Sequence, residues 1–214
     1  YNSNPVAVAP AMAKVVKGFA REDLFPVVLE QFMTDTADHA DYVLPATTQL
    51  EHLDVHTSYG HTYAMFNEPA IAPLGQAKPN TRIFRELAAA MGFDEPCFHD
   101  DDETLARAAL REVDFEQLRR DGWLKLPLAD APFASGGFAT PSGKCVIDAP
   151  GLGVPDFVAN HESALSAPEL ARRYPLAMIS PPARNFLNSS FVNVASLRDI
   201  EGEPLVEIHE ADAL

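Results

Sequence analysis

The stretch LEQFMTDTADHADYVLPATTQLEHLD, residues 29–54, decides the fold of this chain. It completes an apolar run at residues 24–31, LFPVVLEQ, which is typical of a strand buried on both faces in a parallel sheet. Residues 36–41, TADHAD, predict a helix of one or two turns, and residues 42–45, YVLP, predict a second strand. A strand, a short helix and a strand in this order predict a tight βαβ unit, and with it the α/β fold class.

Amphipathic helices are predicted on both sides of this unit. Apolar residues recur at helical spacing in four segments, namely 11–23, 81–92, 101–113 and 114–122. Residues 51–80 are rich in His, Tyr, Asn and Pro, and we expect them to form a long irregular loop. Long loops inside a compact domain commonly carry function.

The last third of the sequence changes from helical to strand-like patterns. Two short strands are expected around the Pro-Ser-Gly turn of residues 136–150, and single strands at 175–180 and 203–209. This change predicts a domain boundary. The expected domains are an α/β region at 1–173 and the start of a β domain at 174–214.

Composition limits the possible partners. The formal net charge of −15 and the pI of about 4.7 give a surface that repels phosphate backbones, so we expect no nucleic-acid binding. No apolar run approaches the ~18 residues of a membrane span, so we expect no direct membrane insertion. Cys97 and Cys145 lie far apart in no metal-binding spacing, and we expect buried or idle thiols.

Polar residues gather where the first strand ends: Glu30, Gln31, Thr34, Asp35 and Thr36. In an open parallel sheet, ligands bind beyond the carboxyl ends of the strands. A carboxylate there can accept two hydrogen bonds, which suits the amide edge of guanine or a ribose diol. The alternative is that Thr34 or Asp35 only caps the short helix. The sequence contains neither G-x-G-x-x-G nor G-x-x-x-x-G-K-[ST], which disfavours the standard dinucleotide and P-loop sites.

Two further polar clusters allow both a functional and a structural interpretation. His52 and His56 are four residues apart, a metal-like spacing on a helix, but Gly60 and the β-branched residues nearby disfavour a helix. These histidines can equally bond backbone or substrate, and we predict no metal site. In SPPARNFLNSSF, residues 180–191, Arg184 and several amide and hydroxyl groups could bind a phosphorylated ligand or form a capped surface loop. No motif identifies a catalytic nucleophile.

Several phrases together resemble the DMSO reductase family of molybdopterin oxidoreductases. The distinctive one is FMTDT at 32–36, followed by ADYVLPAT at 40–47 and by Glu51. Other stretches resemble later or flanking phrases of the family in the same order: YNSNPVAVAP (1–10), NEPAIAPLGQAKPNTRIFRELAAAMG (67–92), TPSGKCVI (140–147) and YPLAMISPPARNFLNSSF (174–191). The resemblance spans nearly the whole chain.

The resemblance implies a fold, a cofactor and a chemistry. The fold would be a Rossmann-like parallel-sheet portion followed by the start of a β-barrel-type cofactor-binding domain. The cofactor would be bis-molybdopterin guanine dinucleotide carrying molybdenum or tungsten. The parent enzyme would transfer two electrons, with an oxygen atom or a hydride equivalent, to or from a small substrate, and could work with an electron-transfer subunit. The expected location is cytoplasmic; an export signal would lie upstream of Tyr1.

The resemblance also implies which residues touch the cofactor. Glu30 and Thr34 match positions that bind a guanine, with Thr36 beside them. The remaining matches are a loop that borders the cofactor and a pterin- and phosphate-contacting loop: Asn2, Ser3, Asn4, Ser180, Asn188, Ser189 and Ser190. Pro181 and Pro182 depart from the Gly and Arg that commonly stand in the second loop.

The family's cysteines for a [4Fe-4S] cluster, and the protein ligand of its metal, lie ahead of the matched segment. The chain begins at Tyr1 and stops at EIHEADAL, where a helical pattern has just begun. We therefore expect a fragment of a longer enzyme that is inactive alone. The alternatives are a catalytically inert homologue serving as a structural or binding subunit of a redox complex, and an unrelated acidic α/β ligand-binding domain.

Overall fold

The structure is a computed structural model that describes residues 3–129, 131–148 and 151–213. The chain forms two compact units. Unit 1 comprises Tyr1–Leu128 and Arg184–Leu214, and unit 2 comprises Ala129–Ala183. These two units are defined by the contacts between residues. The domain boundary that the sequence predicts near residue 174 is a different kind of division, and it stays a prediction.

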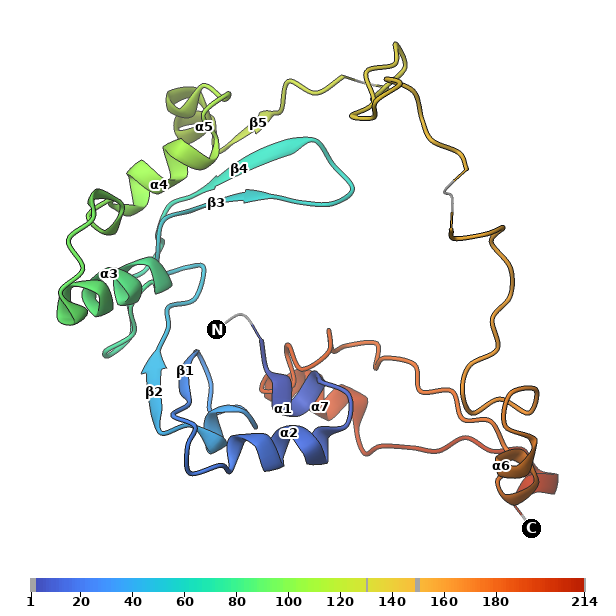
Figure 1. Cartoon of the computed structure of the whole chain (residues 1–214). Helices are drawn as coiled ribbons and strands as arrows, with labels where there is room; N and C mark the ends of the chain where they lie inside the picture. The colour runs from blue at the N-terminus through green and yellow to red at the C-terminus, as the bar shows by residue number, and fades with distance from the viewer. Residues whose placement is uncertain (1–2, 130, 149–150, 214) are drawn as a thin grey trace. The chain divides into compact units, whose positions relative to one another are not determined.

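The βαβ unit predicted from residues 29–54 is present in unit 1 (Figure 1). Strand β1 (Val27–Glu30) pairs in parallel with β2 (Tyr42–Pro45), and the register places Glu30 opposite Pro45. The connecting helix is the single 3-10 turn η1 (Ala37–His39). The mixed α/β fold class is therefore confirmed, with both strands ending at the same edge.

Two short helices precede this unit. Helix α1 (Pro5–Val8) begins with a proline, whose fixed φ and missing N–H suit the first helical position. It packs against α2 (Met12–Phe19), which lies inside the helix predicted at 11–23.

The prediction of one long irregular loop at 51–80 is wrong in part, because this segment contains a β-hairpin. Strand β3 (Asp54–Thr57) pairs antiparallel with β4 (Tyr63–Asn67), which pairs in turn with β5 (Trp123–Lys125). Val55 and Phe66 face each other in the register, as do His56 and Met65. The strand is hard to predict because its four residues include a single aliphatic side chain, Val55.

Three helices follow β4, as predicted, and pack on this antiparallel sheet or beside it: α3 (Asn80–Met91), α4 (Asp102–Ala109) and α5 (Phe115–Asp121). The Asp114 carboxylate caps α5 by accepting the Gln117 N–H at 3.0 Å. Gly92 and Gly122 end α3 and α5 with positive φ, which glycine adopts without steric cost. Leu118 is fully buried against β4 and β5.

The strands expected at 136–150, 175–180 and 203–209 are wrong for the residues that the structure describes there, which form no strand. Their apolar side chains have no partner strand; Ile147, Met178 and Val206 are each more than four-fifths exposed. The remaining elements, in chain order, are η2 (Pro96–Phe98), α6 (Pro168–Arg173), α7 (Ala195–Glu201) and η3 (Glu210–Asp212).

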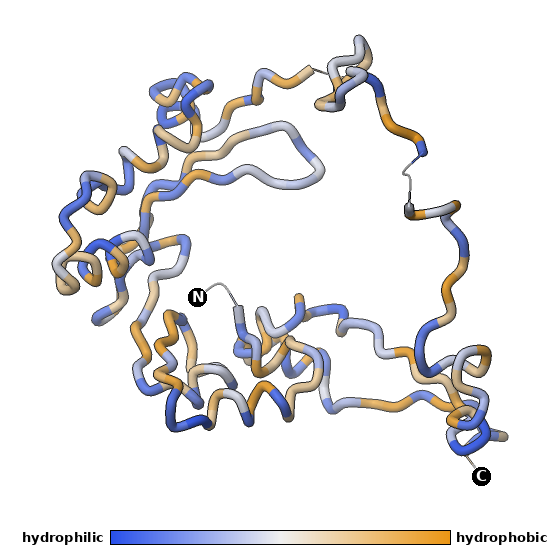
Figure 2. The backbone as a smooth tube through the Cα atoms, in the orientation of Figure 1, coloured by the Kyte–Doolittle hydropathy of each residue, from blue (hydrophilic) through white to orange (hydrophobic). Residues whose placement is uncertain are grey.

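The chain exposes an unusually large surface. Its accessible area is 17429 Å², whereas a compact monomer of its mass, 23.3 kDa, would expose about 9,700 Å². Apolar stretches recur along the irregular parts of the chain (Figure 2). Within the described residues, no helix is both long and apolar enough to cross a membrane.

Candidate functional site

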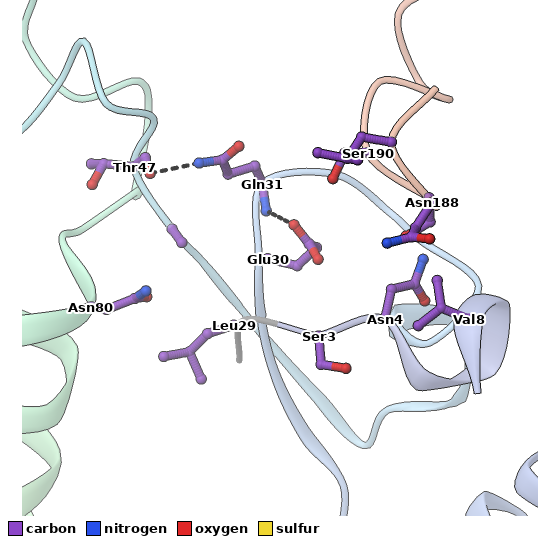
Figure 3. Close-up of a pocket in the computed structure, with 13 residues that line it drawn as sticks. Ser3, Asn4, Val8, Leu29, Glu30, Gln31, Thr47, Asn80, Asn188 and Ser190 are labelled. Carbon is purple, nitrogen blue, oxygen red and sulfur yellow. Dashed lines mark hydrogen bonds between the residues drawn. The ribbon is translucent and has the colours of Figure 1, made fainter. Parts of the chain in front are cut away.

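A pocket of about 460 Å³ lies at the carboxyl end of β1. Figure 3 shows its walls, which come from five segments of unit 1. These are the N-terminal loop, the ends of β1 and β2, the start of α3 and the turn at 187–190. The lining residues are Ser3, Asn4, Val8, Leu29, Glu30, Gln31, Ala46, Thr47, Asn80, Leu187, Asn188, Ser189 and Ser190.

Glu30 and Gln31 form the strand-end wall. The Gln31 backbone N–H donates to Glu30 Oε1 at 2.8 Å, and Gln31 Nε2 donates to the Thr47 carbonyl at 2.8 Å. The second bond fixes the Gln31 amide with its nitrogen toward β2, so that its oxygen is the atom available to a ligand (Figure 3). The wall thus offers carboxylate and amide oxygens, which are hydrogen-bond acceptors.

Asn80 is a pocket residue that the sequence analysis missed. It is the first residue of α3, and the preceding Pro79 provides no side-chain cap. Asn80 Oδ1 is buried and has no hydrogen-bond partner among the described residues. Such an acceptor costs about 1–3 kcal/mol when left unsatisfied. The available signal was an Asn placed directly before the apolar periodicity of the helix.

Thr36 and Asn4 tie the N-terminal loop to the βαβ unit. Thr36 Oγ1 donates to Asn4 Oδ1 at 2.6 Å and accepts the Val6 N–H at 3.1 Å. Both residues are buried, at 3% and 7% exposure. Asn4 lines the pocket, but Thr36 does not, and its hydroxyl is committed to these two bonds. Its assignment as a cofactor contact stays a prediction.

A second pocket of about 430 Å³ shares Asn4, Glu30, Gln31, Ser189 and Ser190 with the first. Thr34 lines this second pocket. Thr34 Oγ1 also accepts the Ala37 N–H at 3.4 Å, the local capping role that the sequence left open. The two pockets together bring most of the predicted residues around one end of β1.

One predicted residue lies elsewhere, and another is not described. Ser180 belongs to unit 2 and is exposed, while Asn2 lies outside the described residues. Figure 3 places Asn188 beside Asn4 and Ser190 above Glu30, so the 187–190 turn lines the same pocket; that these residues contact a cofactor stays a prediction.

The histidines form no metal site in the described part of the chain, where no cluster of three His, Cys, Asp or Glu side chains could hold an ion. The His52 Nδ1 atom lies 2.8 Å from Thr47 Oγ1, and its Nε2 lies 3.9 Å from Asp54 Oδ2. His56 is on β3, which excludes the shared helix face. Cys97 and Cys145 are free and exposed, so of the two expected alternatives, buried or idle thiols, the buried one is wrong for both.

Glu51 accepts hydrogen bonds that join the loop segments at Thr48 and Leu74. Its carboxylate accepts the Thr48 N–H at 2.7 Å, the Thr48 hydroxyl at 2.8 Å and the Leu74 N–H at 2.6 Å. The backbone N–H of Thr48, and then that of Leu74, hold the pKa of Glu51 below its usual value. Glu51 is thus a buried structural carboxylate, and it lines neither of the two pockets.

The chain is similar to known proteins over most of its length. The family model for molybdopterin oxidoreductase matches residues 1–90. The probable oxidoreductase YoaE of Bacillus subtilis (strain 168) is 37% identical over 221 residues, which covers 100% of this chain and 32% of YoaE. Acetylene hydratase of Syntrophotalea acetylenica is 32% identical over 210 residues, or 92% of this chain and 28% of the hydratase.

The chain is also similar to a solved structure. The acetylene hydratase from Pelobacter acetylenicus matches with a TM-score of 0.72 and 29% identity, covering 89% of this chain and 28% of that one. The chain therefore spans about a third of the length of these relatives.

Proposed function

Because this chain belongs to the molybdopterin oxidoreductase family, we propose that the pocket at the end of β1 holds the guanine nucleotide end of a bis-molybdopterin guanine dinucleotide carrying molybdenum or tungsten. Family membership implies a molybdopterin cofactor with one of these metals, and it overturns the alternative of an unrelated acidic α/β domain. The single observation that carries the proposal is the cluster of acceptors at the pocket.

The described residues fit the guanine end of this cofactor. The amide edge of guanine carries donors at N1 and N2. The pocket offers acceptors in the Glu30 carboxylate and the fixed Gln31 amide oxygen. An adenine edge presents an acceptor at N1, which would face these acceptors without a hydrogen bond. The pocket therefore favours guanine.

The opposite wall suits the polar remainder of a nucleotide. Ser3, Ser189 and Ser190 carry hydroxyls, and Asn188 carries an amide. Hydroxyl and amide hydrogens can donate to phosphate or ribose oxygens without reading a base. These residues would orient the cofactor, while Glu30 and Gln31 would recognise its base.

When bound, the metal-carrying cofactor supplies the two-electron chemistry, and the protein supplies binding, orientation and exclusion of water. We propose that the whole protein performs a two-electron oxidation or reduction of a small substrate, with an electron-transfer partner and a [4Fe-4S] cluster held outside this chain. The chain's own residues would then act at the nucleotide end of the cofactor.

A second candidate reaction is hydration. Two of the matches are acetylene hydratases, at 32% and 29% identity, and a hydratase adds water instead of transferring electrons. Dye-linked electron transfer and acetylene consumption by the purified full-length protein separate the two reactions. A full-length protein that binds the cofactor and performs neither would support the inert-subunit alternative.

Binding of GDP to full-length protein prepared without cofactor tests the pocket. Glu30→Ala should weaken GDP binding at least tenfold, the loss of a charge-assisted hydrogen bond of about 1.5–3 kcal/mol. Glu22→Ala, which removes an exposed carboxylate outside the pocket, is the matched control and should leave affinity unchanged. If the Glu30→Ala protein binds GDP as tightly as the parent protein does, the pocket is not the nucleotide site.

A further inference from the structure

The turn at 187–190 forms one wall of the pocket, yet it belongs to no helix or extended sheet. It is closed by two backbone bonds, Leu187 N–H to the Ser190 carbonyl at 3.3 Å and Ser190 N–H to the Leu187 carbonyl at 2.9 Å. Asn188 has φ +53° and Phe191 has φ +69°. Residues with side chains occupy this left-handed region only where their surroundings impose it.

The anchor of this segment is a carboxylate on α7. Glu201 Oε1 accepts both the backbone N–H of Asn185, at 2.6 Å, and the Asn185 Nδ2, at 2.7 Å. Both side chains are half-buried. The two residues are sixteen positions apart, so the pair closes a loop that contains the turn and the whole of α7, whose last residue is Glu201. Two charge-assisted bonds to one oxygen fix Asn185 in position and orientation.

We infer that Glu201 and Asn185 are positioning residues for nucleotide binding: they hold Asn188, Ser189 and Ser190 in the conformation that the ligand needs. The inference rests on the proposed nucleotide pocket and deepens it. Neither Glu201 nor Asn185 lines the pocket, so they act through the turn and make no contact with the ligand themselves.

The physical effect is preorganisation. A turn that is already formed spares the ligand the entropy of ordering three polar side chains and a left-handed backbone on binding. Without the anchor, the segment samples other conformations, and the apparent affinity falls by the fraction of time spent in the competent one. We expect a loss of roughly tenfold in GDP affinity.

The experiment measures GDP binding to full-length protein prepared without cofactor, for Glu201→Ala, Asn185→Ala and the double variant. Each single variant should bind about tenfold more weakly, and the double variant no more weakly than either, because both remove the same anchor. Glu203→Ala, which removes an exposed carboxylate two residues beyond Glu201, is the control and should bind like the parent protein. The thermal midpoint should change little in all of them.

A reversal experiment separates positioning from general destabilisation. Asn185→Asp sets two carboxylates against each other and should weaken binding, while adding Glu201→Gln restores a donor and should recover affinity. If the parent protein binds GDP and the anchor variants bind it equally well, the positioning role is overturned and the pocket stands. If the parent protein does not bind GDP, the pocket assignment fails, and the inference fails with it.

Discussion

At the scale of single residues, Thr36 illustrates how one hydroxyl joins two distant segments. It is bonded to Asn4 and Val6, which lie about thirty residues earlier in the chain. This bond network fixes the loop that carries Asn4 into the pocket wall. The geometry of the pocket therefore depends on a residue that does not line it.

Thr36→Val keeps the shape of the side chain but leaves the Val6 N–H without its partner, and it leaves Asn4 Oδ1 with only the longer bond from the Thr36 backbone N–H, at 3.3 Å. Buried polar groups that lose a partner cost about 1–3 kcal/mol, and we expect that loss in urea-induced unfolding. Thr34→Val is the matched control, because Thr34 Oγ1 makes one long bond of 3.4 Å and should cost less. Equal losses in the two variants would contradict the role assigned to Thr36.

Glu51 gives a pH prediction. Its pKa is lowered in the folded protein, chiefly by the Thr48 N–H. The carboxylate therefore stabilises the fold above its unfolded-state pKa, and this contribution disappears as the pH falls through its folded-state pKa. Glu51→Gln should lower the thermal midpoint at neutral pH, and the gap to the parent protein should narrow in acid. The prediction is contradicted if the difference in thermal midpoint between Glu51→Gln and the parent protein does not change with pH, or if Glu22→Gln shows the same difference.

At the scale of elements, the sequence predicted those whose pattern is local. Val27–Glu30 and Tyr42–Pro45 are continuous apolar runs, and Asn80–Met91 has a regular apolar face, so strands and helix could be assigned. The hairpin at 54–67 was missed because β3 has four residues with Val55 as its one aliphatic side chain, and β4 has five residues, so neither strand shows an alternation long enough to recognise. Asn80 was missed as a site residue because its unpartnered oxygen is a property of packing, which no single sequence position reveals.

Leu118→Ala tests the packing of α5 on the antiparallel sheet. Leu118 is fully buried, and truncation should cost about 2–5 kcal/mol in urea-induced unfolding because it leaves a cavity. Leu118→Met, which nearly conserves volume, should cost less than about 1.5 kcal/mol. A loss below 1 kcal/mol for the alanine variant would show that α5 is not packed as described.

At the scale of the whole molecule, the dominant feature is exposed apolar surface. The strands expected at 175–180 and 203–209 have the composition of strands but no pairing partner among the described residues. The local sequence shows that a segment is able to form a strand. Whether it does so depends on a neighbouring strand, which the local sequence does not reveal. The chain spans about a third of the length of its relatives.

This surface predicts that the isolated 214-residue chain self-associates. Light scattering after size-exclusion chromatography should show oligomers whose mass increases with protein concentration. An isolated chain that remains monomeric and unfolds in a sharp, reversible thermal transition would contradict this expectation.

The central claim is that the end of β1 holds the guanine nucleotide of a metal-carrying pterin. The most direct measurement is the metal and nucleotide content of the purified full-length protein, with and without Glu30→Ala. The account predicts molybdenum or tungsten, about two guanine nucleotides released per metal, and a clear loss of both in the variant. Protein that contains neither pterin nor guanine nucleotide, or a variant that keeps full cofactor content, would contradict it.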